Sequence, residues 1–166
     1  MDFTQISRVI DEMTLWYQGN PKRINHFLKV YAYAKAIGEL EGLDEETRFI
    51  LETTAVLHDI GIKIAEEKYG SGEGPLQEKE GAPAAREMLT ALGFPEKVAE
   101  RAAILVGRHH TYTNVDGMDC QILLEADFLV NAYEGNKSMD AIRTMDEKVF
   151  RTNTGKRFLA RLFYKD

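Results

Sequence analysis

Helical periodicity is the feature of this sequence that most constrains its fold. Apolar residues recur at intervals of three and four in successive segments, as at Ile6, Val9 and Met13 in the first of them. This spacing places apolar side chains on one face of an α-helix, whereas a half-buried strand requires strict alternation of apolar and polar residues. No segment of the sequence alternates convincingly, so we expect an all-α fold.

Turn-forming residues divide the periodic pattern into short segments. The run Gly70–Pro75 is the strongest turn signal in the chain. Asp44, Ser138 and either Thr152 or Thr154 carry side chains of the kind that cap helix N-termini. The sequence therefore predicts helices over residues 6–16, 21–42, 44–59, 62–69, 80–92, 95–109, 120–133, 138–150 and 154–164.

The length and composition indicate one ordinary globular domain. The chain has 166 residues, of which 44% are hydrophobic and 29% charged, and it contains no repeat or low-complexity tract. A second independent core would be cramped at this length. We expect a single compact multi-helix domain over residues 1–166. The sequence leaves the oligomeric state open, and a homodimer is one possibility.

Charge and hydropathy exclude several classes of function. With 21 Lys and Arg against 27 Asp and Glu, the net charge is −6, which argues against binding a nucleic-acid polymer through its phosphates. No apolar stretch approaches the roughly 18 residues of a membrane span, and the N-terminus lacks a signal-peptide pattern. The single cysteine, Cys120, cannot form an internal disulfide. We therefore expect a cytoplasmic protein without a membrane partner.

Four polar residues stand out because they fall in apolar helical segments. His58 and Asp59 end the run that begins at Thr53, His26 lies early in the second predicted helix, and Asp127 lies in the middle of an apolar one. Burying such groups without partners costs about 1–3 kcal/mol each. Two imidazoles and two carboxylates would form a mixed shell suited to Mn, Fe, Ni or Zn or, less readily, Mg. The plain alternative is a set of satisfied core residues in a metal-free protein.

The order of these residues resembles the metal-binding signature of the HD-domain superfamily of metal-dependent phosphohydrolases. A histidine, a His-Asp dipeptide and a later helical aspartate correspond here to His26, His58-Asp59 and Asp127, and the dipeptide's flanks are similar as well. The resemblance covers about residues 23–133 and implies an HD-type fold, with the helices of residues 138–164 packing on that region. It also implies that these four residues bind a divalent metal ion.

A second metal ion is a further implication of the resemblance. Members of the superfamily with two ions carry a histidine or a His-His pair between the dipeptide and the last aspartate, where this chain has His109-His110. Another histidine of those members is missing here; Glu80 or, less favoured, Glu78 could replace it, and the alternative is that these acidic residues face solvent. In that case Asp59 would bridge the two ions. With one ion only, His109 or His110 would contact the substrate or transfer a proton.

Two cationic residues are candidates for binding a phosphate group. Lys63 follows the dipeptide after Ile60, Gly61 and Ile62; it could reach the site across the loop, or its side chain could simply be solvated. Arg23 lies one turn before His26, so it could bind phosphate or orient Asp59. We expect Asp59, His110 and Lys63 to take part in catalysis, and Arg23 and Lys63 to bind the substrate.

The expected function is metal-dependent hydrolysis of a small phosphorylated metabolite or nucleotide, as a phosphomonoester, phosphodiester or anhydride. Two alternatives stay open. The first is a non-catalytic module that binds a metal or nucleotide as a sensor, and the second is a di-iron oxygenase, because a few members of the superfamily use the site for oxidation.

Overall fold

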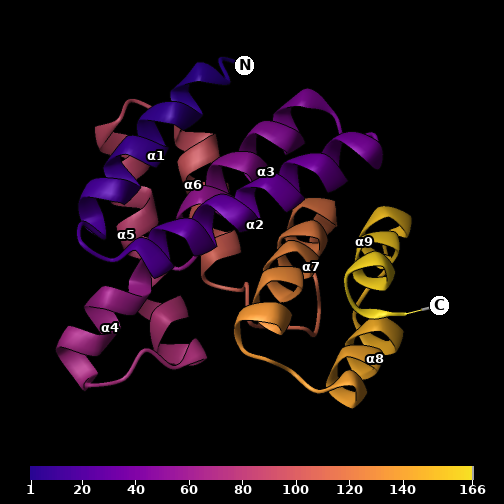
Figure 1. Ribbon diagram of the computed structural model, residues 1–166. Coiled ribbons are helices and arrows are strands. Elements are labelled where there is room, and N and C mark those ends of the chain that lie inside the picture. The colour runs from indigo at the N-terminus through magenta and orange to yellow at the C-terminus, as the bar shows by residue number, and fades with distance from the viewer. Residues whose placement is uncertain (166) are drawn as a thin grey trace.

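The computed structural model describes residues 1–165 and confirms the all-α prediction. This part of the chain forms helices joined by short turns, and it contains no strand (Figure 1). The helices are α1 (Thr4–Trp16), α2 (Pro21–Leu40), α3 (Glu45–Leu57), α4 (Gly61–Tyr69), α5 (Gly74–Ala91), α6 (Glu96–Val106), α7 (Gly117–Glu134), α8 (Met139–Lys148) and α9 (Asn153–Phe163).

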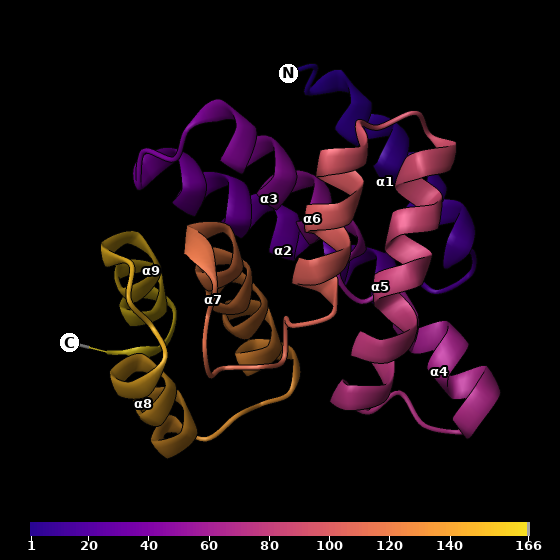
Figure 2. The ribbon, with the colours of Figure 1, turned by 180° about the vertical axis from the view of Figure 1, so that it is seen from behind.

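Helices α3 and α7 form the centre of the molecule. Helix α3 packs against α1, α2, α6 and α7, and α2 also packs along α7. Every residue from Phe49 to Ile62 is buried, as is every residue from Asp119 to Val130 in α7. Seen from behind, α5 and α6 lie side by side (Figure 2). Burial of each large apolar side chain contributes about 1.5–3 kcal/mol, so polar residues within these two segments need a specific reason to be there.

Side-chain caps fix the start of several helices. The carboxylate of Asp44 accepts a hydrogen bond from the Thr47 amide, and the Ser138 hydroxyl accepts one from Ala141. Both caps agree with the prediction from the sequence. At α9 the cap is Thr152, whose hydroxyl oxygen accepts from the amide of Gly155 at 2.8 Å.

The buried carboxylate of Glu125 connects the C-terminal helices to α7. Glu125 accepts hydrogen bonds from the Arg151 amide at 3.1 Å and from the hydroxyl of Thr152 at 2.5 Å. Gly155 packs so closely against this carboxylate that an added Cβ would collide with it. The start of α9 is therefore held by a polar contact inside the protein.

Helix α5 begins earlier than the sequence suggested. We expected a loop through Pro75 and a helix from about residue 80, but the helix starts at Gly74. Pro75 lies in its first turn, where proline is tolerated because the missing amide would have no partner there. Because of this earlier start, Glu78 and Glu80 both lie within the helix, on different sides of it.

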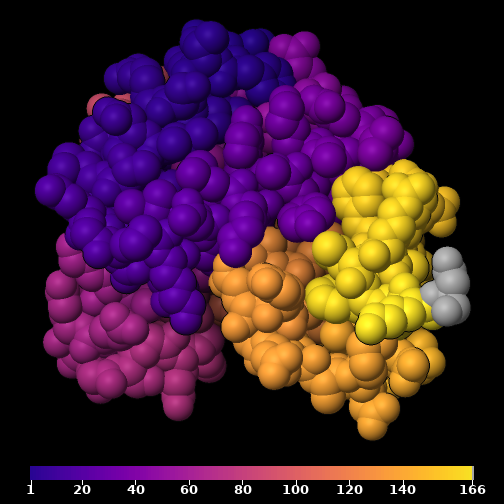
Figure 3. Space-filling view, viewed as in Figure 1, coloured from indigo at the N-terminus to yellow at the C-terminus, as the bar shows by residue number. Residues whose placement is uncertain are grey.

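None of the helices within residues 1–165 has both the length and the apolar character that a membrane span requires. The surface seen in Figure 3 is notched below α2, between the part formed by α4 and α5 and the part formed by α7 to α9.

Candidate metal centre

Three separate segments bring the predicted ligands together. His26 lies on the second turn of α2, His58 and Asp59 lie between α3 and α4, and Asp127 lies midway along α7. Each of these four residues offers one donor atom, and the four atoms all lie within 4.8 Å of one another. The side chains are at least nine-tenths buried. The structure thus assembles the group of four that the sequence singled out.

The distances within this group match a shell around one small ion. The Nε2 atoms of His26 and His58 are 3.2 Å apart. Oδ1 of Asp127 is 3.3 Å from His26 Nε2 and 3.2 Å from His58 Nε2. Oδ2 of Asp59 is 3.1 Å from His26 Nε2. These separations are similar to those between neighbouring ligand atoms of a tetrahedral or octahedral ion.

The other ring nitrogen of each histidine already has a partner. His58 Nδ1–H donates to the Ala55 carbonyl oxygen at 2.8 Å, and His26 Nδ1–H donates to Glu134 Oε2 at 3.0 Å. Because a carbonyl or carboxylate oxygen only accepts, the proton resides on Nδ1 in both rings. The Nε2 atoms therefore face the cluster, and each offers a lone pair to a metal ion once Nε2 carries no proton.

Charge in the cluster also favours a cation. Burial alone would lower the pKa of His26, but the carboxylates of Asp127 and Asp59 raise it to about 10. Burial likewise acts to raise the pKa of Asp59 and of Asp127, yet His58 and the neighbouring imidazoles hold both well below their usual range. The two carboxylates are thus ionised and attract positive charge.

An orphaned oxygen supports the fit of a metal ion. Oδ1 of Asp127 is buried and has no hydrogen-bond partner within the described chain, although two imidazole nitrogens lie near it. Buried carboxylate oxygens are rarely left in this state. A cation between Asp127, His26 and His58 would satisfy the oxygen and both lone pairs together, so the residues present fit a divalent metal ion.

Asp59 also takes part in a second group of donors. Its Oδ1 atom lies 2.9 Å from His109 Nε2 and 3.9 Å from His110 Nε2, while Oδ2 faces His26 and His58. The Nδ1–H of His109 donates to the Val106 carbonyl oxygen at 2.7 Å, which leaves Nε2 facing Asp59: it donates to Oδ1 when it carries a proton and offers a lone pair to a cation when it does not. The two oxygens of one carboxylate thus face two donor groups, the arrangement expected of a bridging ligand.

The structure places Glu80 outside both groups of donors. Its carboxylate accepts a hydrogen bond from the Tyr69 hydroxyl at 2.7 Å and pairs with Lys68 at 3.0 Å. Glu78, which we considered less favourable, lies closer to the histidine pair and accepts a hydrogen bond from the His110 amide at 2.9 Å. The two residues are two positions apart, so their side chains leave α5 about 200° apart.

Lys63 also has partners away from the donors. Its ammonium group donates to the Trp16 carbonyl oxygen at 3.1 Å and lies 5.5 Å from the centre of the indole ring. Arg23 does approach the cluster, because its Nη1 atom is 3.5 Å from Asp59 Oδ2. Its side chain is 31% exposed and that of His110 is 26% exposed. These two residues therefore define the accessible side of the cluster.

Two glycines set the position of the dipeptide. A Cβ atom on Gly61 would collide with the Gln77 carbonyl oxygen and the backbone of Gly81, and one on Gly81 would lie 2.8 Å from Val106 Cγ1. Helices α4 and α5 therefore touch through their backbones immediately after Asp59. Tyr17 adds a further tie, since its hydroxyl donates to the Asp59 carbonyl oxygen at 3.1 Å.

Sequence reasoning did not include Glu134, the partner of His26. The one available signal is its spacing, because it follows Asp127 by seven residues and so returns to the same face of a helix. Glu134 also pairs with Lys29, whose Nζ lies 2.5 Å from Oε1.

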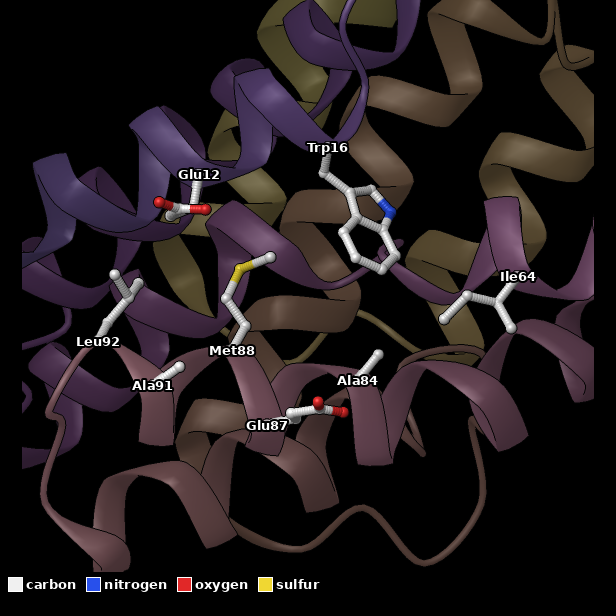
Figure 4. Close-up of a pocket in the computed structure, with 8 residues that line it drawn as sticks. All are labelled: Glu12, Trp16, Ile64, Ala84, Glu87, Met88, Ala91 and Leu92. Atoms are coloured by element: carbon white, nitrogen blue, oxygen red, sulfur yellow. The ribbon is translucent and has the colours of Figure 1, made fainter.

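A groove of about 450 Å³ lies elsewhere, between α1, α4 and α5. Figure 4 shows Trp16 and Met88 at its centre and the carboxylates of Glu12 and Glu87 on its two sides. It is lined by none of the four donors, so we do not place the chemistry there.

Comparisons with known proteins agree with this geometry. The family model described as HD domain matches residues 23–140. Among solved structures, the chain is similar to a "predicted HD superfamily hydrolase" from an uncultured Thermotogales bacterium, with 22% identity and a TM-score of 0.66. That match covers 96% of this chain and 84% of the other. No curated protein matches the chain.

Proposed function

The chain belongs to the HD domain family, and from that premise we propose that it is a metal-dependent phosphohydrolase acting on a small phosphorylated metabolite or nucleotide. The observation that carries this proposal is the buried group of His26, His58, Asp59 and Asp127, whose donor atoms lie within 4.8 Å of one another. A divalent ion held by these residues would activate water and polarise a phosphoryl oxygen.

The residues around the donors would bind and orient the substrate. Arg23 presents a guanidinium group beside Asp59 on the accessible side, and such a group binds phosphate oxygens through two hydrogen bonds. His110 lies near the other oxygen of Asp59, with its Nε2 atom 3.9 Å from Oδ1, and this buried Nε2 atom has no hydrogen-bond partner within residues 1–165. Burial and the neighbouring His109 lower the pKa of His110, so its neutral ring could accept a proton from water or, once protonated, donate to a leaving group.

Asp59 would organise the site from its centre. One carboxylate oxygen faces the pair His26 and His58 and the other faces His109. A second cation beside His109 would make Asp59 a bridge, and two ions would clamp the attacking and leaving oxygens of a displacement. Glu78 is then the acidic residue of α5 best placed to assist, because it already holds the His110 amide.

A small substrate fits the arrangement better than a polymer. The donors are almost entirely buried, and Arg23 and His110 are the partly exposed residues beside them. A net charge of −6 gives a polyanion little attraction to the rest of the surface.

Elemental analysis followed by a substrate screen tests the proposal. We expect the purified protein to carry a divalent transition metal, and to release phosphate or a nucleotide product from at least one member of a panel of phosphomonoesters, phosphodiesters and nucleotides. Chelation should abolish this release, and the same metal should restore it. Hydrolysis that survives complete chelation would contradict the mechanism. A stably bound metal without turnover on the whole panel would favour the sensor alternative.

A further inference from the structure

Glu134 and Lys29 form a pair beside the metal ligand His26. Glu134 Oε2 accepts the Nδ1–H of His26 at 3.0 Å, and Oε1 of the same carboxylate lies 2.5 Å from Lys29 Nζ. The side chain of Glu134 is 18% exposed and that of Lys29 is 47% exposed. One carboxylate thus connects a buried imidazole to a cation near the surface.

His26 differs in this respect from the two other buried histidines. His58 and His109 donate their Nδ1–H to backbone carbonyl oxygens three residues earlier, those of Ala55 and Val106. Those partners are neutral and belong to the same turn of the chain. The partner of His26 is charged, and it comes from a different helix.

The geometry of both helices supports this arrangement. Arg23 and Lys29 lie three residues before and after His26 on α2, so they flank it one turn away on either side. On α7, Asp127 and Glu134 are seven residues apart and share a face. Each helix therefore supplies one donor to the cluster and one member of the pair that orients His26.

We propose that Glu134 is the positioning residue for His26, and that Lys29 holds its carboxylate in place, so that the pair sets how tightly the centre binds its metal. A carboxylate that accepts the second N–H of a metal-bound imidazole fixes the ring and makes it a stronger ligand. This inference rests on the metal-binding part of the proposed function and requires no particular substrate.

The test compares the metal affinity of full-length variants by competition with a chelator, using Zn²⁺ and Mn²⁺ as probes. Glu134→Ala should weaken metal binding by roughly 10–100-fold, which is the usual effect of removing a residue that hydrogen-bonds to a metal-binding histidine. Glu134→Gln retains an oxygen that accepts from Nδ1, so it should recover much of that loss. Lys29→Met leaves the contact between Glu134 and His26 in place and should have a smaller effect than Glu134→Ala.

Glu12→Ala provides the matched control, because Glu12 is a partly buried carboxylate on a helix in the distant groove. Its metal affinity should equal that of the wild type. Thermal unfolding of the metal-free variants separates positioning from folding, since Glu134→Ala should weaken metal binding without lowering the melting temperature more than the control does. An affinity of Glu134→Ala within twofold of that of Glu12→Ala would overturn the inference.

Metal affinity is measured without any substrate. If the variants show the expected differences in metal affinity but the wild type hydrolyses no substrate, the proposed activity is refuted and the positioning role of Glu134 stands.

Discussion

The Nε2 atoms of His26 and His58 lie 3.2 Å apart, while Nδ1 of each ring donates its own proton to a different oxygen. Two lone pairs at this separation repel each other unless a positive charge lies between or beside them. In the metal-free protein a proton fulfils this role, which is consistent with the raised pKa of His26. The ligands are therefore arranged for a cation before one binds.

Removing one ligand should remove the metal. We expect His58→Ala and Asp59→Ala each to lower the metal content of the purified protein to background and to reduce hydrolysis by more than about 100-fold, beyond the loss typical of an outer partner. Elemental analysis and turnover measure the two effects. Met88→Leu, a change of similar volume in the distant groove, should alter neither. Full metal occupancy in the His58→Ala variant would show that His58 is not a metal ligand.

Metal should raise the thermal stability of the wild type. A ligand that binds only the folded state stabilises it by about 2.7 kcal/mol when its concentration is 100 times Kd. Differential scanning fluorimetry should therefore show a melting temperature that rises with added metal and falls back when a chelator is present. Asp127→Ala should melt at the same temperature under both conditions. A persistent rise in Asp127→Ala would place the metal elsewhere.

The stability of the metal-free protein should fall at alkaline pH. The pKa of His26 is about 10 in the folded protein, against an ordinary value of 6.5. A pKa raised on folding contributes stability that is complete below the unfolded value and is lost as pH rises through the folded value. Urea unfolding with chelator should thus show a free energy of unfolding that declines from about pH 6.5 towards pH 10.

Two comparisons check the origin of this decline. His26→Ala should reduce it, because the group that gains the proton is absent. The metal-loaded wild type should lack the contribution of His26, because the ion replaces its proton and metal binding releases protons. An equal slope in His26→Ala and wild type would assign the effect to other groups.

Gly155→Ala should destabilise the attachment of α9. The new methyl group would collide with the Glu125 carboxylate, and overpacking of this kind costs about 1–3 kcal/mol. In a Glu125→Ala background the same substitution should cost less, because only the contact of the new methyl group with the Thr152 hydroxyl remains. A double-mutant cycle from urea unfolding measures the difference, and additive effects would contradict the contact.

The helices and the four donors could be predicted from sequence because both depend on local patterns. The carboxylates of α5 could not be ranked in this way. An error in the predicted start of α5, at about residue 80 instead of Gly74, removed any basis for deciding which side of the helix faces the histidines. The structure turns Glu78 towards His110 and Glu80 towards Tyr69.

The direction of Lys63 depends on a neighbour that is distant in sequence. The ammonium group has a carbonyl oxygen and an indole ring of Trp16 available on α1, and nothing in the spacing around His58-Asp59 reveals that α1 lies there. Glu134 was missed for the same reason, since its contact with His26 requires the docking of α7 on α2. Short sequence motifs indicate candidate metal ligands. The residues that hydrogen-bond to those ligands depend on how the helices pack, which the motifs do not show.

The contact between Gly61 and Gly81 has a consequence for anyone who wishes to transplant this centre into another protein. Where two helices meet backbone to backbone, peptide geometry fixes their separation, and no rotamer can adjust it. Asp59 lies two residues before Gly61, so its position is fixed by the same contact. A graft that copied His26, His58, Asp59 and Asp127 onto a host with side chains between the corresponding helices would displace the Asp59 carboxylate from its partners.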